Sequence, residues 1–169
     1  MATKWNLDPT HSEITFKVRH MMISNVKGQF KNFTAEVEAE DDTFKNAKTT
    51  AKIDVASIDT NNADRDAHLK NEDFFNAAAN PSIIFQTDAL NEEITGNLTI
   101  GGVTKPIKLD VEFGGINKDP WGNTKAGFTF EGKIKRSDFG LNWNAALETG
   151  GVMVSDEVKI AGELQFVKA

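Results

Sequence analysis

The chain has 169 residues, no cysteine and a formal net charge of −6 at pH 7. This length predicts a single domain, residues 1–169, that can bury a sizeable core. The acidic balance excludes the broad basic surface with which proteins hold nucleic acid or anionic membranes. The absence of cysteine excludes disulfides, thiol nucleophiles and cysteine-ligated zinc.

The first thirty residues do not form a secretory signal, because Trp5, Asp8, His11 and Glu13 interrupt the stretches that a signal requires. No window approaches the roughly 18 consecutive apolar residues of a transmembrane helix. We therefore expect a soluble protein with no integral membrane segment. We expect it to be cytoplasmic, or periplasmic if a signal sequence was removed and replaced by Met-Ala.

Apolar and polar residues alternate with a period of two along most of the chain, which predicts antiparallel strands with one covered face. In chain order the expected strands cover residues 12–20, 27–40, 47–58, 82–90, 93–100, 105–114, 124–137 and 157–168. Residues 20–24 predict one helical turn, and Gly28 predicts a bulge or bend in the second strand.

Eight long antiparallel strands predict an all-β protein, either a closed barrel or a two-sheet sandwich. Strands of eleven or more residues span over about 30 Å at roughly 3.3 Å per residue, which favours the barrel. Such a barrel is filled by side chains or holds one small ligand. Small residues on the inward faces favour the ligand over the packed alternative: Ala35, Ala39, Ala47, Ala51, Gly132 and Gly162.

Residues 57–81 interrupt the strand pattern between the third and fourth strands. Asn61 or Asn62 is suited to cap a short helix whose first turn is acidic. Phe74 and Phe75 follow and could plug one end of the barrel. A long polar crossover of this kind is more often functional, or a plug, than a simple connection.

Two polar residues continue the apolar faces of their strands and are expected to point inward. They are His20, after Phe16 and Val18, and Arg136, after Ile134. An inward arginine is unfavourable unless an anion pairs with it, and its planar fork suits carboxylate or phosphate. The partner could be a ligand or a fixed carboxylate such as Asp138 or Asp66.

Catalytic and metal-binding signals are weak. The sequence has no Gly-x-Ser-x-Gly, no phosphate-binding glycine loop and no His-Glu-x-x-His, and His11, His20 and His68 have no metal-ligand spacing. Asp64 or Asp66 could act with His68 in acid–base chemistry, but such an arrangement more often serves helix capping and ion pairing. We expect no catalytic residues, no metal and no cofactor.

Five longer motifs occur in order along the chain. They are W-x-L-D-x-x-H-S-x-I-x-F-x-V-x-H-M followed by V-x-G-x-F within residues 5–30, S-I-D-T at 57–60, R-D-x-H-L-K-x-x-D-F-F at 65–75, G-x-L-T-I-x-G-V-T-K-P at 96–106 and R-S-D-F-G-L at 136–141. Together they resemble the YceI-like family of lipocalin-like polyisoprenoid-binding proteins. The resemblance implies an elongated eight-stranded lipocalin-like barrel with an apolar tunnel for a long isoprenoid, an isoprenoid quinone or a similar lipid. It also implies a homodimer.

We therefore expect a non-enzymatic protein that carries or sequesters a long-chain amphiphilic lipid. The expected tail pocket is Phe16, Val18, Phe85, Val111, Phe113, Phe128, Phe130, Ile134, Ile160 and Leu164, and the expected head-group residues are His20, Arg65, Asp66, His68 and Arg136. Two alternatives stay open. One is an isomerase- or cyclase-type enzyme that uses His68 and Asp66, and the other is a packed barrel that acts as a stress-related interaction module.

Overall fold

A computed structural model describes residues 2–21, 23–72, 74–141 and 154–169. Its strands are β1 Thr3–Leu7, β2 Glu13–His20, β3 Ser24–Phe30, β4 Phe33–Ala39, β5 Ala47–Asp54, β6 Ile58–Asp59, β7 Ser82–Thr87, β8 Glu92–Ile100, β9 Val103–Lys118, β10 Thr124–Lys135 and β11 Val154–Lys168. The helix α1 covers Ala63–Lys70, and three short 3₁₀ turns cover Pro9–His11, Val55–Ser57 and Arg136–Phe139.

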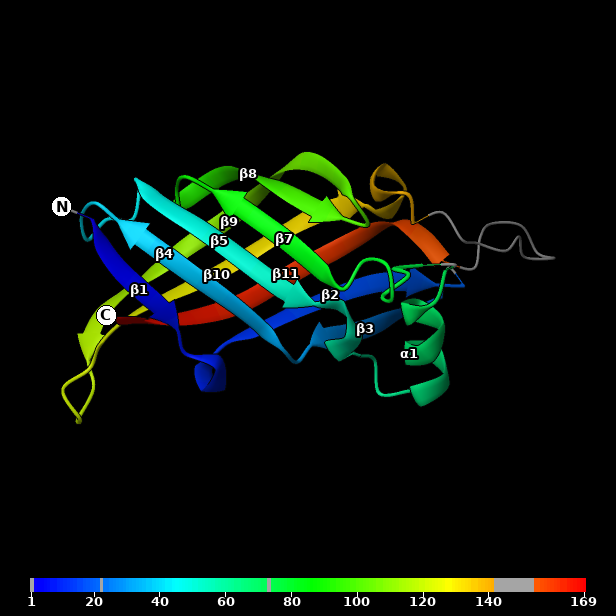
Figure 1. Ribbon diagram of the computed structural model, residues 1–169, viewed down its shortest axis with the longest axis horizontal. Coiled ribbons are helices and arrows are strands. Elements are labelled where there is room, and N and C mark those ends of the chain that lie inside the picture. The colour runs from blue at the N-terminus through cyan, green and yellow to red at the C-terminus, as the bar shows by residue number, and fades with distance from the viewer. Residues whose placement is uncertain (1, 22, 73, 142–153) are drawn as a thin grey trace.

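The strands form a closed antiparallel barrel, which confirms the expected fold class. Eight strands make the ring in the order β1-β4-β5-β7-β8-β9-β10-β11, and β11 pairs back to β1 to close it. Strand β11 is long enough to pair with β1 at its C-terminal end and with β2 along the rest of its length. Strands β3 and β6 continue the sheet beyond β2, so the barrel widens toward the end where α1 lies (Figure 1).

The strand boundaries differ from the sequence expectation in several places. The strand expected over residues 47–58 ends at Asp54, where the Val55–Ser57 turn begins, and the strand expected over residues 105–114 extends to Lys118. Strand β1 was not expected, because five residues are too few to show a clear alternation of apolar and polar residues. The expected strand over residues 27–40 divides at Lys31–Asn32, where Lys31 N–H bonds the carbonyl of Ser57. His20 of β2 pairs with Ser24 of β3, and the Ile23 N–H donates to the carbonyl of His20. The helical turn expected over residues 20–24 includes Met22, which lies outside the described residues.

The bulge expected at Gly28 is absent, since β2 and β3 pair without a shift from Thr15–Gln29 to His20–Ser24. A register shift lies instead between Gly127 and Phe128, where β10 pairs with β9. Gly28 instead leaves room for the ring of Phe16, which a side chain at this position would meet.

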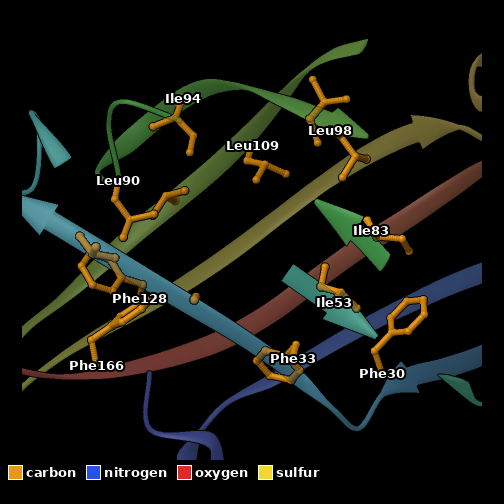
Figure 2. Packing of buried hydrophobic residues seen from close by; sticks show 14 of the residues in the cluster. Phe30, Phe33, Ile53, Ile83, Leu90, Ile94, Leu98, Leu109, Phe128 and Phe166 are labelled. Atoms are coloured by element: carbon orange, nitrogen blue, oxygen red, sulfur yellow. The ribbon is translucent and has the colours of Figure 1, made fainter. Parts of the chain in front are cut away.

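The barrel interior is apolar along its length. Strand β4 illustrates the pattern, because Phe33, Ala35, Val37 and Ala39 are buried while the residues between them are exposed. Figure 2 shows Phe30, Ile53 and Ile83 at one end of the interior and Leu90, Phe128 and Phe166 at the other. None of the helices in the described ranges is long and apolar enough to cross a membrane.

Candidate functional site

An apolar cavity of about 200 Å³ runs inside the barrel. Its wall comes from both sides of the sheet, including Phe16 of β2, Phe85 of β7, Leu109 of β9 and Ile160 of β11. Among the described residues that line it, only Thr49 and Arg136 have polar side chains. The interior therefore offers a continuous apolar surface, with one charged group.

A cluster of aromatic rings closes the barrel near the chain termini. Phe44, in the turn between β4 and β5, is fully buried and lies 5.3 Å from Trp5, 5.1 Å from Phe113 and 4.9 Å from Phe128 between ring centroids. Phe128 also meets Phe166 at 5.8 Å. Tilted and edge-on ring contacts at these separations are favourable. We call these five residues the aromatic plug, and the cavity begins beside Phe128.

Three phenyl rings of the cavity wall lie against glycines on neighbouring strands. A Cβ atom added to Gly28 would stand 2.3 Å from the ring of Phe16, and one added to Gly162 would stand 2.4 Å from the ring of Phe130. Phe85 covers Gly96 in the same way, at 2.3 Å. Each glycine removes the atom that would hold its ring away from the wall. A larger residue at any of the three positions would therefore push the ring out of its present place in the wall.

Arg136 lies at the other end of the cavity, where β10 passes into the 3₁₀ turn. Its side chain is 6% exposed and donates three hydrogen bonds to backbone carbonyls: Nε to Ser155 at 3.0 Å, Nη1 to Leu141 at 2.6 Å and Nη2 to Val154 at 3.2 Å. These carbonyls, rather than Asp138 or Asp66, are its hydrogen-bond partners. Burial lowers the pKa of Arg136, and the nearby charge of Asp156 opposes that shift.

The helical insert lies at the end of the barrel where β10 ends and the Arg136–Phe139 turn begins (Figure 1). Asn62 caps α1 by accepting a bond from Arg65 N–H at 3.0 Å, as expected for one of the two candidate caps. From the helix and the turn that follows it, Leu69, Phe74 and Phe75 line the cavity. Phe75 meets Phe30 edge-on with ring centroids 6.3 Å apart. The insert is thus an apolar lid over the cavity.

A buried threonine ties this lid to the barrel. Thr60 is 3% exposed, and its N–H and hydroxyl both donate to Oδ1 of Asp66. Arg65 donates from Nε to the Thr60 hydroxyl at 2.7 Å and from Nη2 to the Thr60 carbonyl. Asp66 and Arg65 are consequently engaged with one residue at the base of the helix.

Most of the expected tail-pocket residues line the cavity, whereas most of the expected head-group residues do not. Nine of the ten expected tail-pocket residues line the cavity: Phe16, Val18, Phe85, Val111, Phe128, Phe130, Ile134, Ile160 and Leu164. Phe113 is not among the lining residues, and its ring packs against Phe44 and Phe128 in the aromatic plug.

Of the expected head-group residues, Arg136 lines the cavity, whereas His20, Arg65, Asp66 and His68 are not among its lining residues. The ring of His68 packs edge-on against Phe74 with centroids 5.1 Å apart. The fold brings Arg65, Asp66 and His68 to the lid, but not into the cavity wall.

Several residues of the wall were not predicted from the sequence. Strands β7 to β9, with the turn between β7 and β8, contribute a second apolar set that the alternation pattern already contains: Ile83, Leu90, Ile94, Leu98, Ile100, Ile107 and Leu109. Gly28 and Gly96 were not singled out for contact with a ring. Their signal is a phenylalanine at a facing or diagonal position of the next strand, which depends on register.

A second polar contact ties strand β1 to the barrel at the corner before β2. Asp8 accepts a bond from Lys125 Nζ at 2.7 Å, and Thr10 and His11 also bond its carboxylate. The bond from Lys125 is the largest of the influences that hold the pKa of Asp8 well below its usual range.

Comparisons with known proteins agree with this architecture. Residues 5–166 match the YceI-like domain. A relative in Staphylococcus epidermidis, UPF0312 protein SERP2314, is 44% identical over 166 residues, which is 97% of each chain. The YCEI protein of Campylobacter jejuni has a crystal structure that is 36% identical, with a TM-score of 0.75 over 89% of this chain and 90% of that one.

A polyisoprenoid binding domain from Saccharophagus degradans, implicated in plant cell wall breakdown, shares the fold at 16% identity. Its TM-score is 0.70 over 98% of each chain. The full-length domain match and the staphylococcal relative confirm the resemblance that the sequence motifs suggested, and the chain belongs to the YceI-like domain family.

Proposed function

We propose that this protein binds a long-chain amphiphilic lipid, of the polyisoprenoid or isoprenoid-quinone class, and carries or sequesters it. The observation that supports this most is the cavity itself, which is apolar along its wall, closed at one end by the aromatic plug and bordered at the other by Arg136. The similarity of fold to a domain that is described as polyisoprenoid binding agrees with this choice.

The size of the cavity suits a tail of moderate length. One water-sized group, which is close to a methylene in size, needs about 10–15 Å³ of such volume. A volume of about 200 Å³ therefore holds on the order of 15 carbon atoms. Along β10 the lining extends from Phe128 to Arg136, which is about 26 Å at roughly 3.3 Å per residue. A longer tail would have to leave the barrel at the lid.

The energy of such a complex is consistent with reversible binding. Burial of a methylene contributes about 0.8 kcal/mol, so 15 carbons contribute about 12 kcal/mol before costs. Association costs an estimated 4–15 kcal/mol in lost freedom and ordering. The two are of similar size, so affinity depends on how completely the tail contacts the wall.

We place the polar head of the lipid at the Arg136 end. Arg136 is the only charged residue among the described residues of the wall, and three of its five N–H donors serve the carbonyls of Leu141, Val154 and Ser155. A pyrophosphate or carbonyl oxygen at this end would approach the same guanidinium. His20, Arg65, Asp66 and His68 would meet the head group only where it emerges beside the lid.

We favour a carrier over an enzyme, because Asp66 is bound to Thr60 while the His68 ring packs on Phe74. Neither residue lies in the cavity wall, so an acid–base pair inside the cavity has no support from their positions. The homodimer and the cellular location implied by the sequence stay predictions.

The decisive experiment is to identify what the purified protein holds. We expect gentle native mass spectrometry to detect a bound apolar molecule, and organic extraction to release it in about one-to-one ratio. Ala51 lines the cavity, whereas the neighbouring Thr50 points outward and is exposed. Ala51→Phe fills the cavity and should weaken binding of a farnesyl or longer probe by at least about tenfold.

Thr50→Phe adds the same side chain to the outer wall and should leave binding unchanged. An empty preparation that takes up no isoprenoid probe, with both variants equal to the wild type, would contradict the proposed function.

A further inference from the structure

Four lysines form a continuous row across the outer wall of the barrel. Lys133 of β10 is paired with Lys159 of β11, Lys159 with Lys17 of β2, and Lys17 with Lys27 of β3. Each pair is directly opposite in the ladder, so the four side chains leave the sheet on the same face. We call these residues the lysine row. Neighbouring strands lie about 4.8 Å apart, so the row is about 14 Å long.

When no anion is bound, the lysine row lowers the stability of the folded protein. Like charges that are directly opposite on neighbouring strands are destabilising. In the part of the chain that the structure describes, no carboxylate lies within 4.0 Å of any of the four ammonium groups. Other lysines do have such partners, as Lys31 with Asp59 at 2.8 Å. A local arrangement that lowers stability without compensation is typical of a functional surface.

The row lies in a shallow hollow of the outer wall, with a volume of about 940 Å³. Its neighbours on the adjoining row of β11, β2 and β3 are uncharged: Ala161, Thr15 and Gln29. Four carboxylates and a fifth lysine, Lys108, also line the hollow. The carboxylates lie at the two ends of the adjoining row, where Glu131 pairs with Ala161 and Asp110, Asp110 with Glu93, and Asp59 with Gln29. A protein with a net charge of −6 thus carries a local band of positive charge.

We propose that the lysine row binds a linear chain of phosphate groups that lies across the strands. Lysine binds phosphate as a point charge, and linked phosphates can present an anion to each successive ammonium. An extended acidic peptide fits less well, because carboxylates on one of its faces recur about every 6.6 Å, against about 4.8 Å for the row.

A bilayer also fits less well, because the surface is hollowed. The exposed large apolar residues of the described chain, Met21, Ile23, Ile116 and Trp121, do not line the hollow. The site is on the outside of the barrel and does not depend on what the cavity holds.

The test measures binding of inorganic polyphosphate by calorimetry at several salt concentrations. We expect the wild type to bind, with an affinity that falls as salt rises. Lys17→Glu, in the centre of the row, should weaken binding by at least about tenfold, because it replaces an attraction with a repulsion. It should also reduce the slope of log affinity against log salt by about one or more.

The same variant should melt at a temperature equal to or above that of the wild type, because it places opposite charges across from Lys159 and Lys27. Loss of binding with retained stability separates this effect from unfolding. The matched control is Lys52→Glu, which makes the same charge change at an exposed position of β5 outside the hollow. It should keep its affinity within about twofold, since it lies beyond direct contact.

Three results would overturn the proposal. The first is polyphosphate binding that Lys17→Glu leaves unchanged, and the second is an equal loss in Lys52→Glu, which would indicate nonspecific attraction. The third is that orthophosphate, at the same total phosphate, competes as well as the polymer. Anionic vesicles that bind through Lys17 when polyphosphate does not would assign the row to a membrane surface instead.

Discussion

The close approach of the Phe16 ring to Gly28 leads to a specific prediction about the cavity. In Gly28→Ala the new methyl group would stand 2.3 Å from Cζ and 2.8 Å from Cε1 of the Phe16 ring, and 2.9 Å from Cγ2 of Thr60. Ordinary contact begins at 3.4 Å, so the edge of the ring must move by about 1.1 Å or more. The ring of Phe16 lines the cavity, so we expect it to move toward the cavity.

The size of the effect follows from the volume that the ring would occupy. A phenyl ring swung inward displaces about three methylenes of a bound tail, which is about 2.4 kcal/mol at 0.8 kcal/mol for each. The dissociation constant of an isoprenoid probe should therefore rise roughly 50-fold, at 1.4 kcal/mol for each factor of ten. The extra carbon in a packed wall should also cost about 1–3 kcal/mol of stability.

The assay is titration of each variant with one isoprenoid probe, beside a urea unfolding curve. Gly127→Ala is the matched control, because nothing lies within 4 Å of a Cβ at that strand position. It should bind as the wild type does. Adding Phe16→Ala to Gly28→Ala removes the displaced ring and should restore most of the affinity. If Gly28→Ala binds within about twofold of the wild type, or if the second change restores nothing, the ring does not set the width of the cavity.

Three further predictions concern the polar contacts. The pKa of Asp8 is held low in the folded state, chiefly by Lys125. At neutral pH the free energy of unfolding of the wild type should therefore be about 1.5–3 kcal/mol larger than that of Asp8→Asn. This difference should be complete above the unfolded pKa of about 3.9 and disappear as pH falls through the lower folded value, and a constant difference in acid-titrated unfolding curves would refute it. Asp66→Asn weakens the bonds to Thr60, so hydrogen exchange of the α1 amides should accelerate while β10 stays protected; equal protection of α1 would contradict the tethering role. Arg136→Met leaves three carbonyls without their donor and should lower the free energy of unfolding by about 3 kcal/mol or more, whereas a loss below about 1 kcal/mol in urea unfolding would show that other donors replace it.

Alternation predicted which face of each strand is covered, because a barrel gives every strand one dry and one wet face. It could not give the depth of a residue along the barrel. Phe113 follows Val111 on the same face of β9, yet Val111 lines the cavity and Phe113 packs in the aromatic plug. Depth depends on the stagger between strands, which pairing sets and alternation does not contain.

The polar part of the site was less predictable, for a related reason. Alternation correctly predicted that Arg136 points inward. Its hydrogen-bond partners, however, are backbone carbonyls of the turn after β10 and of the start of β11. Every residue has such a carbonyl, so no side chain in the sequence marks the partner. The cap at Asn62 was predictable because its partner lies three residues away in the same segment.

The pairing of β1 with β11 has a consequence for how the protein folds during its synthesis. Trp5 of β1 pairs with Lys168 of β11, so the first and last strands complete the barrel together. During synthesis, the apolar faces of the earlier strands stay uncovered until β11 has emerged from the ribosome. Contacts this distant in sequence fold slowly and expose unpaired edges meanwhile. Removing the last few residues should therefore cause aggregation of the whole newly made chain, although the cavity wall loses none of its residues.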